Sequence, residues 1–122
     1  MFFPVSGWFA AFVLTVAVEV PIAAYLLREA EPDLVRRVSL IVLANLATHP
    51  VVWFVITQLL RVGTPGYTLV AEAWAVGAEA VFYGVTVRGL AVRRTIAISL
   101  AANAASFLTG RLVSNLWPAL FR

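Results

Sequence analysis

The stretch EVPIAAYLLR at residues 19–28 and the stretch EAVFYGVTVR at residues 79–88 decide the fold of this chain. Each begins with a glutamate inside an apolar segment and ends, at the same spacing, with an arginine. A pair of arginines follows each stretch, and an Asn-x-Ala-Thr or Asn-x-Ala-Ser element closes each unit. The pattern predicts a duplicated helical hairpin with a buried acid and a buried amide in each copy. Ionisable side chains are costly inside a membrane, so they are the first candidates for function.

The composition predicts an integral membrane protein. Of the 122 residues, 62% are hydrophobic and 12% are charged, and the mean hydropathy is +0.94. Soluble domains carry about 25% charged residues, so this chain lacks the polar surface that a globule in water needs. We expect an all-α fold in which residues 1–122 form one domain of four transmembrane helices. Four apolar stretches approach the roughly 20 residues that cross a bilayer, namely Trp8 to Leu27, Ser39 to Leu60, Leu69 to Val87 and Thr95 to Trp117.

The two hairpins are expected to form a parallel internal repeat, at about residues 8–60 and 69–117. A helix rises about 1.5 Å per residue, so the distance of each glutamate from its arginine places Glu19 and Glu79 near the membrane midplane. The distances of Asn45 from Arg37 and of Asn103 from Arg94 place both asparagines at the same depth. Hairpins that run in the same sense can be related by a pseudo-two-fold axis along the membrane normal. We therefore expect both glutamates and both asparagines to face the centre of one bundle.

The arginines predict the orientation in the membrane. Most of them flank the two short connections that follow the first and third apolar stretches, whereas Arg61 and Arg122 lie on the other side and Arg111 lies in the outer half of the last stretch. The positive-inside rule then places both connections in the cytoplasm and both termini outside, and we expect a bacterial inner membrane. This clustering explains the net charge of +3 as a topology signal, so no nucleic-acid partner is expected.

Two short segments predict local structure between the spans. Glu31-Pro32-Asp33 is typical of a helix start, because a proline suits the first turn and an acid suits the positive end of the helix dipole. Thr64-Pro65-Gly66-Tyr67 has the residue order of a type II turn.

Polar residues within the apolar stretches form the candidate transport site. Glu72 lies two turns from Glu79 on the same helix face, and His49, the only histidine, lies one turn outward of Asn45. Two carboxyls in a core of low dielectric cannot readily both ionise, so we expect Glu19 and Glu79 to titrate as a coupled pair. The alternative is that both stay protonated and act as polar glue between helices. The full candidate set is Glu19, Asn45, Thr48, His49, Glu72, Glu79, Asn103 and Ser106.

Other chemistries have weaker support in the sequence. The absence of cysteine excludes a thiolate site, and one histidine without a Glu-x-x-His pair makes no metal motif. No Gly-x-Ser-x-Gly element marks a nucleophile. We expect no metal and no cofactor, and catalysis is less expected than transport. Acid–base chemistry on a lipid is neither supported nor excluded.

Two functions from different classes remain open. The first is a small proton- or cation-coupled transporter or channel that uses the midplane glutamates. The second is a non-catalytic membrane subunit or assembly factor, whose polar core fixes the helix register within a larger complex. The expected partners are the lipid bilayer and either further copies of the chain or another membrane protein. An accessory subunit should carry small residues that point away from its own bundle, whereas we expect Ala73, Gly77, Ala80 and Gly84 to permit close packing within it.

Overall fold

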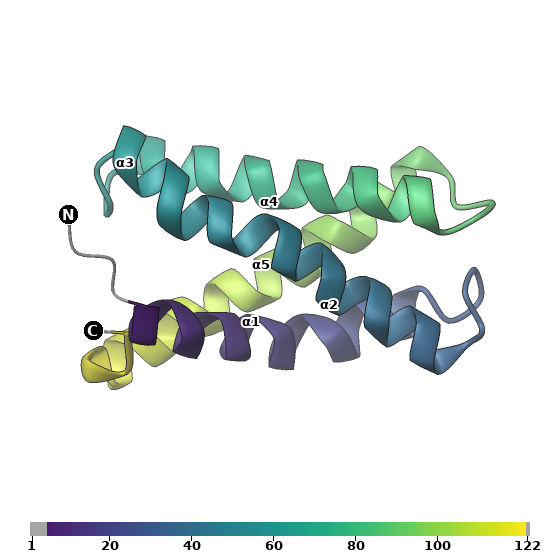
Figure 1. Ribbon diagram of the computed structural model, residues 1–122, viewed down its shortest axis with the longest axis horizontal. Helices are drawn as coiled ribbons and strands as arrows, with labels where there is room; N and C mark the ends of the chain where they lie inside the picture. The colour runs from purple at the N-terminus through teal and green to yellow at the C-terminus, as the bar shows by residue number, and fades with distance from the viewer. Residues whose placement is uncertain (1–4, 122) are drawn as a thin grey trace.

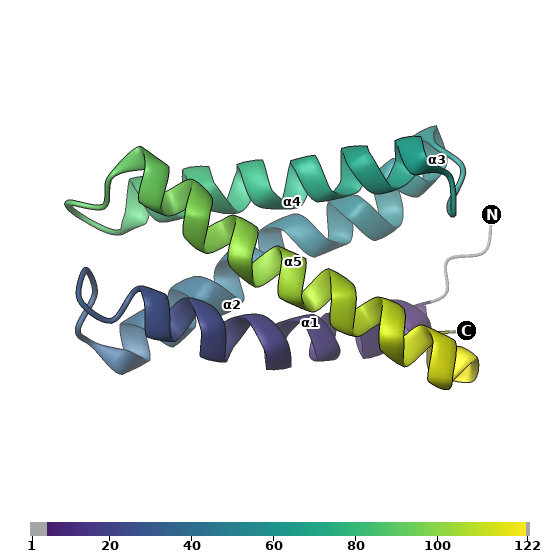
Figure 2. The same ribbon diagram turned by 180° about the vertical axis from the view of Figure 1, so that it is seen from behind.

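The computed structural model describes residues 5–121, which form a bundle of long helices (Figures 1 and 2). The long helices are α1 (Val5–Leu26), α2 (Leu34–Val51), α4 (Pro65–Thr86) and α5 (Val92–Leu116). The π-helical segment η1 (Val52–Ile56) and α3 (Thr57–Leu59) continue α2, and the 3₁₀ turn η2 (Pro118–Phe121) follows α5. Four segments are long and apolar enough to cross a membrane, namely Ser6–Leu26, Leu34–Leu59, Pro65–Thr86 and Val92–Leu116. The expected all-α architecture is confirmed, while Arg122 lies outside the described residues.

The long helices pack in a cycle. Helix α1 contacts α2 and α5, and α4 contacts the same two helices. In Figure 1, α1 and α4 lie along opposite edges while α2 crosses in front and α5 crosses behind, and Figure 2 shows the reverse side. Connections 27–33 and 87–91 lie together at one end, which we call the arginine end. The start of α1, the end of α5 and connection 60–64 lie at the other, the terminal end.

Side-chain caps set where two helices begin. Asp33 accepts a hydrogen bond from the Arg36 N–H at 3.2 Å, and Thr64 accepts one from the Tyr67 N–H at 3.3 Å. These bonds satisfy backbone donors that have no partner within the first helical turn. A helix does start directly after Glu31-Pro32-Asp33, but Asp33 is its N-cap, so Pro32 lies before the helix and not in its first turn. The predicted type II turn at residues 64–67 was wrong, because Pro65 occupies the first position of α4 and the positive φ of 86° belongs to Gly63.

The apolar core fills the half of the bundle between the two glutamates and the arginine end. It draws buried side chains from all four long helices, and the largest of them are Tyr83, Leu27, Ile41 and Val87. The outer surface is also apolar, with Val85 79% exposed. A soluble protein rarely exposes an apolar surface of this extent, whereas lipid would cover it.

Arg36 ties the two hairpins together at the arginine end. Its Nε donates to Glu31 Oε2 at 2.7 Å, and its Nη2 donates to the Thr86 carbonyl oxygen at 3.0 Å. Arg37 donates from Nη1 to the Glu31 backbone carbonyl at 2.8 Å. Because Thr86 is the last residue of α4, the bond from Arg36 joins the start of α2 to the end of α4, while the bonds to Glu31 stay within the first hairpin.

At the terminal end, the η2 turn packs against the start of α1. A Cβ atom on Gly7 would lie 2.6 Å from the Phe121 carbonyl oxygen, closer than a real contact allows. Glycine is therefore required for this approach of two backbones.

Candidate functional site

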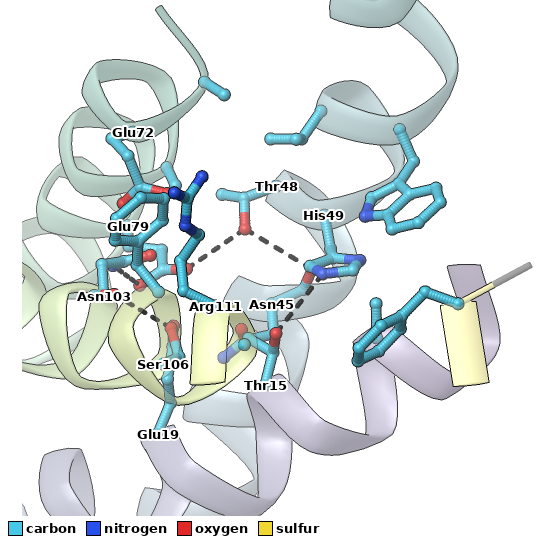
Figure 3. A pocket seen from close by; sticks show the side chains of 18 of the residues that line it. Thr15, Glu19, Asn45, Thr48, His49, Glu72, Glu79, Asn103, Ser106 and Arg111 are labelled. Atoms are coloured by element: carbon cyan, nitrogen blue, oxygen red, sulfur yellow. Dashed lines mark hydrogen bonds between the residues drawn. The ribbon is translucent and has the colours of Figure 1, made fainter. Parts of the chain in front are cut away.

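Glu79 of α4 is buried and has a hydrogen-bond partner on each carboxyl oxygen (Figure 3). Its Oε1 accepts from the Thr48 hydroxyl of α2 at 3.2 Å, and its Oε2 accepts from the Asn103 amide of α5 at 2.8 Å. The Asn103 Nδ2 group also donates to the Ser99 carbonyl at 2.9 Å. The Glu79 side chain thus joins three helices in the interior of the bundle.

Glu19 of α1 is fully buried and accepts a hydrogen bond from the other hairpin. Its Oε1 accepts from the Ser106 hydroxyl of α5 at 2.7 Å. Asn45 lies beside the same carboxyl, but its Nδ2 donates along its own helix to the Ile41 carbonyl at 3.0 Å. The second hydrogen of the Asn45 amide is still available to the carboxyl, although Glu19 Oε2 has no hydrogen-bond partner of good geometry among the described residues.

Each carboxyl is bonded by a hydroxyl from the other hairpin. Ser106 donates to Glu19, and Thr48 donates to Glu79. Each hydroxyl also lies within hydrogen-bond distance of a backbone carbonyl, at 3.1 Å from Asn103 for Ser106 and at 3.1 Å from Ala44 for Thr48. A hydroxyl carries one proton and two acceptor lone pairs. It can therefore donate to an ionised carboxylate, or donate to the carbonyl and accept from a protonated carboxyl.

A cavity of about 330 Å³ lies between these carboxyls and the terminal end (Figure 3). Every polar residue of the candidate set lines it: Glu19, Asn45, Thr48, His49, Glu72, Glu79, Asn103 and Ser106. The structure thus brings residues from all four long helices to one space. Further along, the lining includes Trp53, Phe107, Arg111, Ser114 and Phe121.

His49 lies in an aromatic part of the cavity wall. Its Nε2 is 3.4 Å from the Thr15 hydroxyl oxygen, and its Nδ1 has no partner among the described residues. The rings of Phe12 and Trp53 lie 5.6 Å and 6.3 Å from the imidazole, centroid to centroid. This environment is mainly apolar, with one hydroxyl to orient the ring.

The helix geometry changes just beyond His49. Pro50 lacks a backbone donor, and the π-helical segment η1 begins two residues later. The Thr48 carbonyl accepts from the Val52 N–H and also from the Trp74 indole, at 3.2 Å. Single π-helical turns occur often at functional sites.

Three further side chains belong to this region, although no sequence motif marks them. Thr15 lies one helical turn from Glu19, and Tyr83 lies one turn from Glu79, each on the same helix face as its glutamate. This spacing was the only sequence feature that could have indicated them. The Tyr83 hydroxyl is buried and has no partner among the described residues. Arg111 is exposed and lines the cavity, and its only signal was a charge within an apolar stretch.

The small residues of α4 form one stripe along the helix, because positions seven apart lie on the same face. Ala80 is buried, and a Cβ on Gly84 would lie 3.7 Å from the Thr95 methyl group, although Gly84 itself is exposed. Ala73 and Gly77 are exposed, and no atom lies within 4 Å of a Cβ placed on Gly77. The expectation that Ala73 and Gly77 pack within the bundle was wrong, because this part of the stripe is left uncovered.

Within residues 5–121, no three acidic or histidine side chains converge in a group that could hold a metal ion. Comparisons with family models, with curated proteins and with solved structures find no match for this chain. Its function therefore has to be inferred from the geometry of the cavity.

Proposed function

We propose that this chain is an integral membrane transporter in which Glu19 and Glu79 exchange protons with a small cation. The observation that carries the proposal is the pair of buried carboxyls lining one cavity. Each has a hydroxyl partner that suits both its ionised and its protonated form. A carboxyl used only as structural glue needs a partner for one form alone.

Electrostatics couples the two carboxyls. Glu79 is close enough to both Glu19 and Glu72 for their charges to repel one another. The other titratable or charged groups of this region are His49 on α2, Tyr83 on α4 and Arg111 on α5. In a medium of low dielectric, ionised carboxylates at short range strongly disfavour one another. A cation that enters would relieve this repulsion and permit a proton to leave, which is the exchange that the proposal requires.

The buried positions support an internal repeat. The same spacing separates Glu19 from Glu79, Ala23 from Tyr83 and Leu27 from Val87, and all of them are buried. A second spacing relates the buried positions of α2 to those of α5, pairing Ile41 with Ser99, Ala44 with Ala102 and Asn45 with Asn103. A two-fold axis along the length of the bundle would exchange α1 with α4 and α2 with α5, in keeping with their crossing in Figures 1 and 2.

The proposed orientation places the arginine end in the cytoplasm and both termini outside, in a bacterial inner membrane. The cavity reaches towards the terminal end, and the apolar core fills the other half. In this orientation the described conformation is open outward and closed inward. Transport then requires the core beside Tyr83 and Leu27 to loosen, and we expect a second copy of the chain to support that movement.

Reconstitution in liposomes tests this function. A pH-sensitive dye inside the vesicles reports proton movement when protons are in excess outside and a small monovalent cation is in excess inside, because the exchange needs both ions. We expect flux with the parent protein and loss of flux with Glu19→Gln or Glu79→Gln, because glutamine keeps the shape but cannot release a proton. Glu29→Gln is the matched control, since the Glu29 side chain is 72% exposed at the arginine end. Equal flux in all four proteins would contradict the proposal.

One observation favours the second function, an accessory membrane subunit. Ala73, Trp74 and Gly77 form an exposed strip of α4 on which another helix could pack closely. Under this reading, Gly77→Leu should release a co-purifying membrane protein, while the glutamine variants of Glu19 and Glu79 should keep it bound. Loss of flux in the glutamine variants would favour the transporter instead.

A further inference from the structure

We propose that the cavity binds a protonated primary or secondary monoamine with an uncharged apolar body, whose ammonium group donates a hydrogen bond to Glu19. This inference rests on the proposed function, because it names the cation that the same site would take.

The unpartnered oxygen of Glu19 calls for a donor. Glu19 is fully buried, and its Oε2 has no partner within the described part of the chain. Ser106 donates to Oε1, and the Asn45 amide donates one of its two hydrogens to the Ile41 carbonyl. A buried acceptor without a donor of good geometry is destabilising. Oε2 is buried in this conformation, so the Glu19 carboxyl has to turn towards the cavity for an ammonium N–H to reach it, and the ammonium would then also neutralise charge beside Glu79.

The requirement for an N–H donor narrows the class of cation. A quaternary ammonium ion carries the charge but has no hydrogen to donate to Glu19 Oε2. No three histidine, aspartate or glutamate side chains converge among residues 5–121, so a metal site built from those ligands has no support there. A protonated primary or secondary amine supplies both the charge and the donor.

The walls of the cavity suit an apolar body attached to that ammonium. Trp53, Phe107 and Phe121 provide aromatic surface, and Ala11 and Ala75 add small apolar side chains. An aromatic ring attracts a cation over its face and also removes apolar ligand surface from water. The ligand can therefore lie with its ammonium at the glutamates and its body along these rings.

The outer part of the cavity carries both signs of charge. Glu72 of α4 and Arg111 of α5 both line it. A ligand carboxylate could pair with Arg111 and a second ammonium with Glu72, so these two charges do not select the end group. The aromatic walls, which suit an apolar body, favour the monoamine.

The volume indicates the size of a ligand body that fits within the cavity. A water molecule occupies about 30 Å³ in the liquid. A cavity of about 330 Å³ therefore holds roughly ten water-sized groups. Phenethylamine, with one ring and one primary ammonium, matches this size and serves as the probe.

The experiment is calorimetric titration of the full chain in lipid nanodiscs with three probes. These are phenethylamine, its N,N,N-trimethyl analogue and 2-phenylethanol, which share the ring and differ in the N–H donor or the charge. We expect phenethylamine to bind about tenfold more tightly than either analogue, as the loss of one hydrogen bond to a charged group implies. Glu19→Gln should reduce phenethylamine affinity by about the same factor, and Glu29→Gln should leave it unchanged.

Equal affinity for the three probes in the parent protein would overturn the amine site, whatever the stability of the variants. Unchanged phenethylamine affinity in Glu19→Gln would also overturn it. Binding is measured without transport, so the two proposals fail separately. Proton flux without phenethylamine binding would contradict the amine site alone, while binding without flux would contradict the transport function alone.

Discussion

The Ser106 hydroxyl donates to the Glu19 carboxyl at 2.7 Å, from the helix of the other hairpin. This bond and its counterpart from Thr48 to Glu79 cross between the two halves of the chain. Each carboxyl therefore depends on a residue that is remote in sequence. The polar centre of the bundle joins the hairpins, in addition to lining the cavity.

Replacing Ser106 should destabilise the bundle. Ser106→Ala leaves both Glu19 oxygens without a hydrogen-bond partner, and an unsatisfied buried polar group costs about 1–3 kcal/mol. Thermal unfolding in detergent measures the change, and Thr48→Ala tests the equivalent bond to Glu79. Ser114→Ala is the control, because its exposed hydroxyl bonds only the nearby Arg111 carbonyl at 3.0 Å. If Ser106→Ala and Ser114→Ala unfold at the same temperature, the hydrogen bond from Ser106 to Glu19 does not stabilise the bundle.

A side chain at position 7 should displace the C-terminal turn. In Gly7→Ala, the new methyl group would meet the Phe121 carbonyl at 2.6 Å, and overpacking of this kind costs about 1–3 kcal/mol. Gly77→Ala adds the same methyl group where no atom lies within 4 Å, so it should not destabilise the protein. The thermal midpoints of the two variants provide the comparison. A Gly7→Ala protein as stable as Gly77→Ala would show that η2 does not pack against α1 as described.

Removing Arg36 should loosen the arginine end. Arg36→Gln loses the bonds to Glu31 and to the Thr86 carbonyl, although solvent screening keeps the expected loss of stability below about 1 kcal/mol. Backbone amides near the end of α4 should therefore exchange with deuterium faster. Arg93→Gln is the control, since Arg93 is exposed near the start of α5. Unchanged exchange in Arg36→Gln would mean that the tie does not restrain α4.

Cysteine labelling tests the orientation. The parent chain has no cysteine, so Ser6→Cys and Leu120→Cys each introduce a single exposed thiol at the terminal end. In intact cells, an impermeant thiol reagent should label both from outside, and Glu29→Cys should be labelled only after lysis. The opposite result would reverse the proposed topology.

The sequence predicted the helices and the polar residues better than it predicted their partners. Apolar length and helical periodicity identified four helices long and apolar enough to cross a membrane, and placed the candidate residues on faces that meet at one cavity. The choice of Ser106 over Asn45 as the hydrogen-bond partner of Glu19 was not predictable. It depends on how the two hairpins cross and on the competing bond from Asn45 to Ile41. The spacing of residues along one helix gives no information about the crossing of the hairpins or about that bond.

The small residues posed a related difficulty. Ala73 and Gly77 belong to the same helix stripe as Ala80, yet they are exposed whereas Ala80 is buried. In a chain whose outer surface is itself apolar, small residues do not distinguish the interior from the surface. Hydrophobic patterning alone cannot settle which part of an apolar stripe packs against another helix.

Infrared spectroscopy of the carboxyl groups tests most directly whether Glu19 and Glu79 gain and lose protons in the folded bundle. The carbonyl stretch of a protonated carboxyl disappears when the proton leaves, and a buried carboxyl absorbs apart from those in water. In the parent protein, raising the pH should diminish the buried band. Each single glutamine variant should lack part of that change, and the Glu19→Gln, Glu79→Gln double variant should lack more than either. A buried band that stays constant with pH in the parent would contradict proton exchange and identify the two glutamates as structural glue.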